Sequence, residues 1–102
     1  MITETGFEGL KIVELKIFHD NRGFFVERFN ADIFTKMGLP TSYFQDNHSL
    51  SYPKVIRGLH YQNNPAQAKL VGCTRGKIWD VAVDIRKNSK TFGKYFAAEL
   101  SA

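Results

Sequence analysis

Apolar and polar positions alternate along much of the chain, which is the period of a β-strand with one covered face. In residues 11–18, KIVELKIF, the apolar side chains Val13, Leu15 and Ile17 are separated by charged ones. Residues 77–85, KIWDVAVDI, repeat the alternation. Five further stretches have the length and composition of strands: 24–29, 43–50, 55–61, 68–73 and 94–100. The pattern therefore predicts seven short strands.

One short helix is expected between two of these strands. Asn30 is a suitable N-cap for the segment ADIFTKM, Gly38 stands where a helix would end, and Pro40 follows. Turn-forming residues separate the strands at 20–23, 63–65, 75–76 and 87–89. Short strands joined by tight turns favour an antiparallel β-sandwich, barrel or jelly roll.

Composition narrows the class of protein. A chain of 102 residues with 43% hydrophobic and 24% charged residues fits one soluble globular domain, residues 1–102. No apolar run approaches the ~18 residues of a membrane span, and the start lacks the features of a secretory signal. The single cysteine, Cys73, fits a reducing compartment, so we expect a cytoplasmic protein without a membrane partner. The net charge of +4 is spread along the chain, which argues against nucleic-acid binding.

Strand parity brings candidate binding residues together. Glu27 shares a face with Phe25 and Phe29, either as a solvated edge or as the wall of a ligand pocket. Gln45 and Asn47 also share a face, which is either solvated or in need of a polar ligand. From the pattern alone, both interpretations stay open.

The segment 55–62, VIRGLHYQ, contains the most unusual residue, His60, three positions after Arg57. Strict alternation points these two side chains to opposite faces, and a bulge at Gly58 would bring them to one side. A histidine on a strand is more often a structural hydrogen-bonding group than a catalyst, and Lys69 in the next strand is as readily a solvated lysine. Spacing alone therefore leaves a catalytic role undecided.

Other chemistries lack support in the sequence. The three histidines, His19, His48 and His60, show no zinc-like spacing and have no partner cysteines, so no metal site is predicted. Neither a phosphate-binding glycine loop nor a nucleophile elbow is present.

Five motifs taken together resemble one enzyme family. The motifs are DNRGFFVERFN, FQDNHSLS, VIRGLHYQ, QAKLV and DVAVDIRKNSKTFG, and they resemble the dTDP-4-dehydrorhamnose 3,5-epimerases from about Ile12 to Ser101. The resemblance implies a cupin-type jelly roll, a homodimer, and no metal or organic cofactor. One local departure is Lys90, where the family usually has proline.

The resemblance also implies roles for individual residues. His60 matches the base that removes the proton α to the C4 ketone of a dTDP-4-keto-6-deoxy sugar. Lys69 matches the cation near the developing enolate oxygen, and Arg57 the residue that binds the diphosphate. Further substrate contacts match Arg22, Glu27, Gln45, Asp46 and Asn47. In the family, the segment with Arg22 and Glu27 reaches the partner subunit's pocket, which implies a composite active site.

Family members continue beyond the position of Ala102 with strands that supply a tyrosine proton donor and a carboxylate that orients the histidine. The resemblance therefore implies an incomplete jelly roll corresponding to the N-terminal part of the family fold. Three functions follow: an epimerase in dTDP-L-rhamnose biosynthesis, a non-catalytic dTDP-sugar-binding or assembly domain, and a generic anion or nucleic-acid binder suggested by charge alone.

Overall fold

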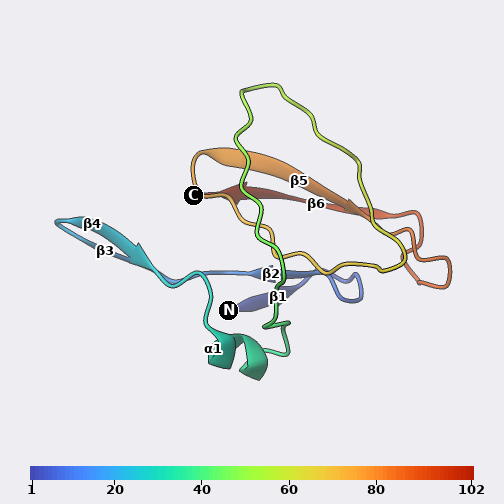
Figure 1. Cartoon of the computed structure of the whole chain (residues 1–102), viewed down its shortest axis with the longest axis horizontal. Coiled ribbons are helices and arrows are strands. Elements are labelled where there is room, and N and C mark those ends of the chain that lie inside the picture. The colour runs from blue at the N-terminus through green and yellow to red at the C-terminus, as the bar shows by residue number, and fades with distance from the viewer.

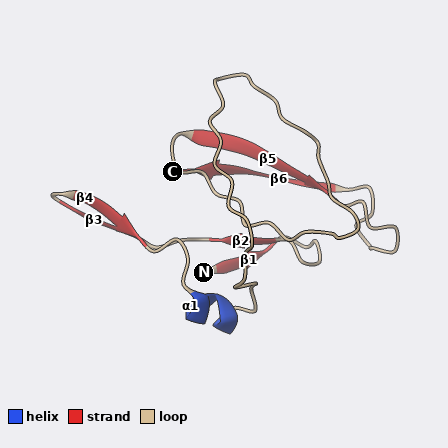
Figure 2. Ribbon diagram, viewed as in Figure 1, coloured by secondary structure: helices blue, strands red, loops and turns tan.

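The computed structural model describes residues 1–102 as six antiparallel strands and one helix (Figures 1 and 2). The strands form three separate two-stranded sheets, β1–β2, β3–β4 and β5–β6. The elements are β1 (Ile2–Glu4), β2 (Lys11–Val13), β3 (Ile17–Asp20), β4 (Gly23–Val26), α1 (Ala31–Lys36), β5 (Lys77–Val83) and β6 (Tyr95–Ser101). The expected all-β class with one short helix is confirmed.

The β5–β6 hairpin is the longest sheet, and it confirms the strands predicted at 77–85 and 94–100. Its register runs from Lys77 opposite Ser101 to Val83 opposite Tyr95. Beyond the strand ends the pairing continues, because the amide of Asp84 donates to the carbonyl of Lys94 at 2.9 Å. The alternating apolar residues of both segments thus form one two-stranded ribbon.

Helix α1 forms where the capping residues predicted it. The side-chain Oδ1 of Asn30 accepts from the amide of Ile33 at 3.1 Å, which satisfies a donor that the first turn leaves free. Gly38 follows with a φ of +69°, a conformation that glycine adopts without strain. Phe34 on this helix is buried, with 3% of its surface exposed, and its ring meets that of Phe29 edge to face.

The run 11–18, predicted as one strand, is divided into β2 and β3, and this prediction was wrong in detail. β2 pairs with β1, whereas β3 pairs with β4, so the chain changes partner within residues 14–16. The prediction of a strand at 24–29 is confirmed only for its first half, because β4 ends at Val26. The three-residue strand β1 was not predicted, since three residues are too short to show a period.

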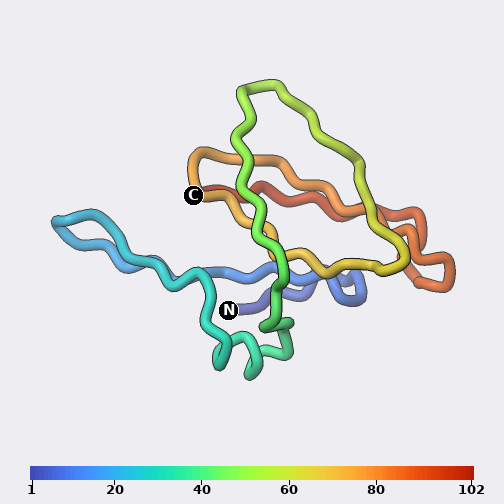
Figure 3. The backbone as a smooth tube through the Cα atoms, viewed as in Figure 1, coloured from blue at the N-terminus to red at the C-terminus, as the bar shows by residue number.

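Three predicted strands, at 43–50, 55–61 and 68–73, are wrong. The chain from residue 39 to residue 76 contains no helix or strand and follows a wide loop past β5 (Figures 2 and 3). Within residues 43–73 the structure has one backbone hydrogen bond, from the amide of Val55 to the carbonyl of Tyr52. Alternation predicts a strand's two faces, but a strand also requires a neighbouring strand to bond with.

Most large apolar side chains lie on the surface of this arrangement. Only Phe34 and Asp84 are buried, whereas Phe44 and Ile56 are 101% and 91% exposed. The accessible area is 9435 Å², compared with about 5,800 Å² for a compact monomer of the same mass by the usual size scaling. The apolar faces of the loop segments are therefore uncovered.

The β1–β2 and β5–β6 sheets meet at the turn that joins β1 to β2. The ring of Phe7 in this turn contacts that of Phe96 on β6 edge to face, with 6.1 Å between centroids. In contrast, the β3–β4 hairpin projects away from the other two sheets (Figure 1). No helix is long and apolar enough to cross a membrane.

Candidate functional site

Gly58 lies between the two most important site candidates, Arg57 and His60, in a stretch that forms no strand. Gly58 has a φ of +104°, which a residue with a side chain rarely adopts. The ring of His60 folds back toward it, so that a Cβ placed at Gly58 would lie 3.7 Å from Nδ1 of His60. Because residues 55–61 form no strand, there is no β-bulge at Gly58, and whether Arg57 and His60 face one side stays a prediction.

Arg57 is held by the segment that precedes it. Its Nε donates to Oγ of Ser51 at 2.9 Å, and its Nη2 donates to the carbonyl of Leu50 at 3.1 Å. His60 is exposed, and no hydrogen bond joins its ring to Arg57 or to another residue. The convergence of Arg57 and His60 on one ligand stays a prediction.

Gln45 and Asn47 lie together, as their shared parity predicts. The Nε2 of Gln45 donates to Oδ1 of Asn47 at 3.0 Å. Both side chains are exposed, as are those of Asp46 and Lys69. The remaining donors and acceptors of the Gln45–Asn47 pair are therefore open to a polar ligand.

Arg22 stands in the turn of the projecting β3–β4 hairpin. Its Nη2 lies 2.6 Å from Oδ2 of Asp20, and its amide donates to the other carboxylate oxygen at 2.8 Å. The Arg22 guanidinium lowers the pKa of the Asp20 carboxyl, and the carboxylate in turn raises the pKa of Arg22. Glu27 follows directly after β4 and is exposed. Arg22 thus belongs to the part of the fold that reaches outward, whereas Glu27 follows the end of that hairpin.

Two contacts bring three of the motif segments together. Oγ1 of Thr74 lies 3.4 Å from Nε2 of His48, which joins the QDNHS segment to the residues after QAKLV. A guanidinium nitrogen of Arg28 lies against Gly72, at 2.6 Å from the position of a Cβ there. The segments that carry Gln45, Glu27 and Lys69 therefore meet around residues 72–74.

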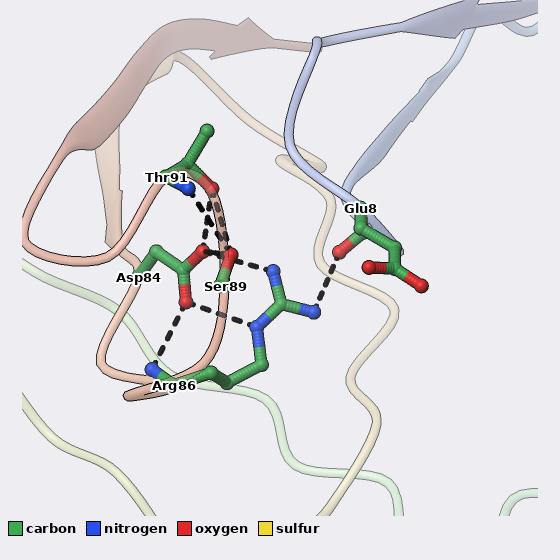
Figure 4. A network of polar contacts seen from close by, with 5 residues as sticks. All are labelled: Glu8, Asp84, Arg86, Ser89 and Thr91. Carbon is green, nitrogen blue, oxygen red and sulfur yellow. Dashed lines mark hydrogen bonds and ion pairs between the residues drawn. The ribbon is translucent and has the colours of Figure 1, made fainter.

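Sequence reasoning missed a network around Asp84, which lies within the DVAVDIR motif, directly after β5 (Figure 4). The buried Asp84 carboxylate accepts from Nε and Nη2 of Arg86, at 2.9 and 3.0 Å. It also accepts from the hydroxyls of Ser89 and Thr91. These donors, Arg86 first, hold the pKa of Asp84 well below its usual range, and Asp84 raises the pKa of Arg86.

A signal for this network was present in the sequence. An aspartate at a strand end followed by Arg, Ser and Thr within seven residues is suited to close a turn around the carboxylate. Lys90, at the position of the usual family proline, lies between the two hydroxyl donors and leaves both bonds to Asp84 in place. A shallow hollow beside the network is lined by Glu8, Arg86, Lys87, Asn88 and Ser89, and it contains none of the predicted site residues.

The described chain gathers no group of three or more His, Cys, Asp or Glu side chains that would hold a metal ion. The polar groups that are in place, two carboxamides and a fixed guanidinium, suit an anionic or hydroxyl-rich organic ligand. Gln45, Asn47 and Arg57 are all exposed, so a ligand in solution can reach them.

Comparison with known proteins connects the motifs to one family. The model of the dTDP-4-dehydrorhamnose 3,5-epimerase family matches residues 4–102. The enzyme of that name from Escherichia coli (strain K12) is 50% identical over 103 residues, which cover 99% of this chain and 56% of the relative. The enzyme of that name from Methanothermobacter thermautotrophicus is 47% identical over 98 residues, 96% of this chain and 53% of the relative.

Solved structures agree with this match. The dTDP-4-dehydrorhamnose 3,5-epimerase of Bacillus anthracis, with TDP and PPi bound, superposes with a TM-score of 0.93 at 43% identity, over 100% of this chain and 59% of that one. The dTDP-6-deoxy-D-glucose-3,5-epimerase of Legionella pneumophila, in complex with dTDP-4-keto-L-rhamnose, gives 0.92 at 46% identity, over 99% and 54%.

The chain thus spans little more than half the length of these relatives. The superposition confirms the expected cupin-type jelly-roll fold, of which the three sheets form a part. The match over residues 4–102 and the agreement of the folds lead to one conclusion: the chain belongs to the dTDP-4-dehydrorhamnose 3,5-epimerase family.

Proposed function

We propose that the chain carries the proton-abstracting part of a dTDP-4-dehydrorhamnose 3,5-epimerase and acts on dTDP-4-keto-6-deoxy sugars in dTDP-L-rhamnose biosynthesis. The observation that supports this most is the 50% identity to an enzyme of that name across 99% of the chain. His60, Lys69 and Arg57 stand within this match. In this proposal residues 1–102 are one domain, the N-terminal part of the jelly roll, in a cytoplasmic protein.

The proposed chemistry begins at His60. Its imidazole takes the proton from a sugar carbon next to the C4 ketone, which is acidic enough for a positioned base to attack. The electron pair moves onto the ketone oxygen, where the Lys69 ammonium stabilises the enolate. A neutral imidazole is required, because only an unprotonated ring nitrogen can accept the proton.

The remaining residues bind the nucleotide sugar. Arg57, already held by Ser51, contacts the diphosphate with a guanidinium that carries unused donors. Gln45, Asp46 and Asn47 contact polar groups of the substrate. Arg22, in the turn of the projecting hairpin, and Glu27, directly after the hairpin, contact substrate in a partner subunit's site, so the working unit is a homodimer with composite sites. Neither a metal nor an organic cofactor takes part in these steps.

Solvent exchange tests the proposal directly. In deuterium oxide, the 102-residue chain should catalyse the replacement of hydrogen by deuterium at C3 or C5 of the keto sugar. Proton NMR measures this exchange as the loss of the corresponding sugar signal. His60→Asn should slow incorporation about 100-fold or more, the range expected for a lost general base. His19→Asn, a matched exposed histidine on β3, should leave the rate unchanged. Absence of exchange by the folded wild-type chain would refute catalysis.

A second candidate is binding of dTDP-sugars without turnover. It is favoured by the arrangement of the polar groups, because Gln45, Asn47 and Arg57 are held by hydrogen bonds whereas His60 has none. Calorimetry with dTDP separates the two functions. Binding of dTDP without deuterium incorporation would establish the second function, and absence of both would exclude the two together.

A further inference from the structure

Gly72 differs from every other glycine in the chain. The other seven glycines have a positive φ, between +69° and +134°, which explains them by backbone conformation. Gly72 does not have such a φ, so an alanine would suit its backbone. Backbone conformation therefore does not explain why glycine occupies position 72.

The side chain of Arg28 occupies the space in which a side chain at position 72 would lie. Its Nη2 stands 2.6 Å from where a Cβ of Gly72 would be, and its Cζ stands 3.8 Å from it. Real Cβ atoms do not tolerate the shorter distance, so the guanidinium occupies the space that the glycine leaves open. Arg28 makes no ion pair and donates no hydrogen bond within the chain, which distinguishes it from Arg22, Arg57 and Arg86. The contact that the structure gives for the Arg28 guanidinium is its packing against Gly72.

The contact joins the two segments that carry Glu27 and Lys69. Arg28 directly follows Glu27 in the chain, and Gly72 is three positions after Lys69. The contact is thus next to both candidate residues along the chain, where it can set the relative position of their two segments.

We propose that Arg28 is a positioning residue: its guanidinium, seated in the space left by Gly72, sets the Glu27 segment against the Lys69 segment. The inference rests on the proposed function, in which Lys69 acts in the site of its own chain and Glu27 in that of the partner subunit. The contact between Thr74 and His48 reaches the same stretch from a third segment.

The structure offers two independent ways to remove the contact. Arg28→Ala deletes the guanidinium. Gly72→Ala keeps it but displaces it, at little cost to folding, because the end of a flexible side chain moves aside. If both act through one contact, their effects are not additive, and the double variant resembles Arg28→Ala alone. Arg28→Lys, which keeps the length and charge, should retain part of the function.

The first readout needs no substrate. Cys73, the only cysteine, is half-buried and directly follows Gly72. The rate at which its thiol reacts with Ellman's reagent therefore reports on whether Arg28 still packs against Gly72. Both single variants should react about three times faster or more, and the double variant no faster than Arg28→Ala, as non-additivity requires. An unchanged rate in Arg28→Ala, or multiplied effects in the double variant, would overturn the proposal.

The second readout is deuterium incorporation into the keto sugar. Misplacement of a site residue by about 1 Å can cost up to 100-fold in rate, so a fall of about tenfold in the maximal rate is expected in both single variants. Arg75→Ala is the matched control, because Arg75 is an exposed arginine without a side-chain partner. An equal loss in this control would assign the effect to net charge and refute positioning. If the wild-type chain shows no exchange, the proposed function fails, and the thiol rates still decide whether Arg28 holds the two segments.

Discussion

Arg86 donates a hydrogen bond from Nη1 to the backbone carbonyl of Glu8 at 2.8 Å, across 78 positions of the sequence. The same guanidinium is held by Asp84 through two further nitrogens (Figure 4). Together with the Phe7–Phe96 contact, this bond fastens the turn between β1 and β2 to the β5–β6 hairpin. The N-terminal hairpin is thus placed by one guanidinium and one pair of rings.

Arg86→Ala should release the β1–β2 hairpin. The amide of Glu14, which donates to the carbonyl of Met1, and those of Thr3 and Ile12, the next hydrogen-bonded pair of the antiparallel ladder, should then exchange with solvent several-fold faster, because protection follows the local opening free energy. Hydrogen exchange followed by NMR or mass spectrometry measures this change. Arg75→Ala serves as control, and unchanged protection in Arg86→Ala would show that the rings alone hold the hairpin.

The contribution of the Asp84 network to the free energy of unfolding should persist until the pH falls below the usual range of a carboxyl group. The folded pKa of Asp84 is depressed by Arg86 and the two hydroxyls, so its stabilisation is fully present above the unfolded pKa of ~3.9 and is lost as the pH falls below it toward the folded pKa. We expect a constant contribution from pH 5 to 8 and a decline below about pH 4. The midpoint of unfolding, measured between pH 2 and 7, should fall less steeply with acid in Asp84→Asn than in the wild type.

Asp20→Asn provides the comparison for that experiment. Asp20 is also depressed in pKa by an arginine, but its ion pair with Arg22 is exposed, and exposed pairs add little to stability. Its substitution should leave the acid dependence nearly unchanged. An equal effect of the two substitutions would contradict a special role for Asp84.

Asn30→Ala should lower the free energy of unfolding by about 1 kcal/mol, the usual cost of a lost N-cap. The Asn30 side chain satisfies the amide of Ile33 at the start of α1, and no other group replaces it. Denaturant unfolding followed by circular dichroism gives the change. Asn30→Asp keeps an acceptor and a favourable charge at the helix start, so it should retain the stability of the wild type.

Arg57→Ala should weaken dTDP binding by about tenfold or more, as expected for a lost charged hydrogen bond. Ser51→Ala removes only the bond that holds Nε of Arg57, and should weaken binding less. Calorimetry with dTDP at two salt concentrations provides the measurement. Equal affinity in Arg57→Ala and the wild type would remove Arg57 from the proposed diphosphate site.

Mixed subunits test the composite site. His60→Asn and Glu27→Gln should each be inactive alone, whereas their mixture should regain deuterium exchange, since one of the two sites then combines an intact His60 with an intact partner hairpin. Mixing His60→Asn with Lys69→Ala, two residues of the same pocket, should restore nothing. A mixture that stays inactive while the subunits demonstrably pair would place Glu27 in its own subunit's site.

Features that depend on neighbouring residues were predictable from the sequence. Asn30 and Gly38 mark the ends of α1, and the alternation in 77–85 and 94–100 gives the β5–β6 ribbon. The candidate residues came from motif resemblance instead: parity alone left His60 and Glu27 undecided. The family, the all-β class and the short helix followed from sequence and agree with the structure.

Partnership between distant segments was decided only by the tertiary structure. The alternating segments around Gln45, His60 and Lys69 form no strands, because a strand needs hydrogen bonds from another strand and alternation does not say whether one is present. The division of 11–18 between two sheets has the same origin. The Arg86–Glu8 bond and the Arg28–Gly72 contact likewise join residues far apart in sequence. Local hydrogen bonds and backbone preferences are written in adjacent residues, whereas these contacts arise only when the folded chain brings remote side chains together.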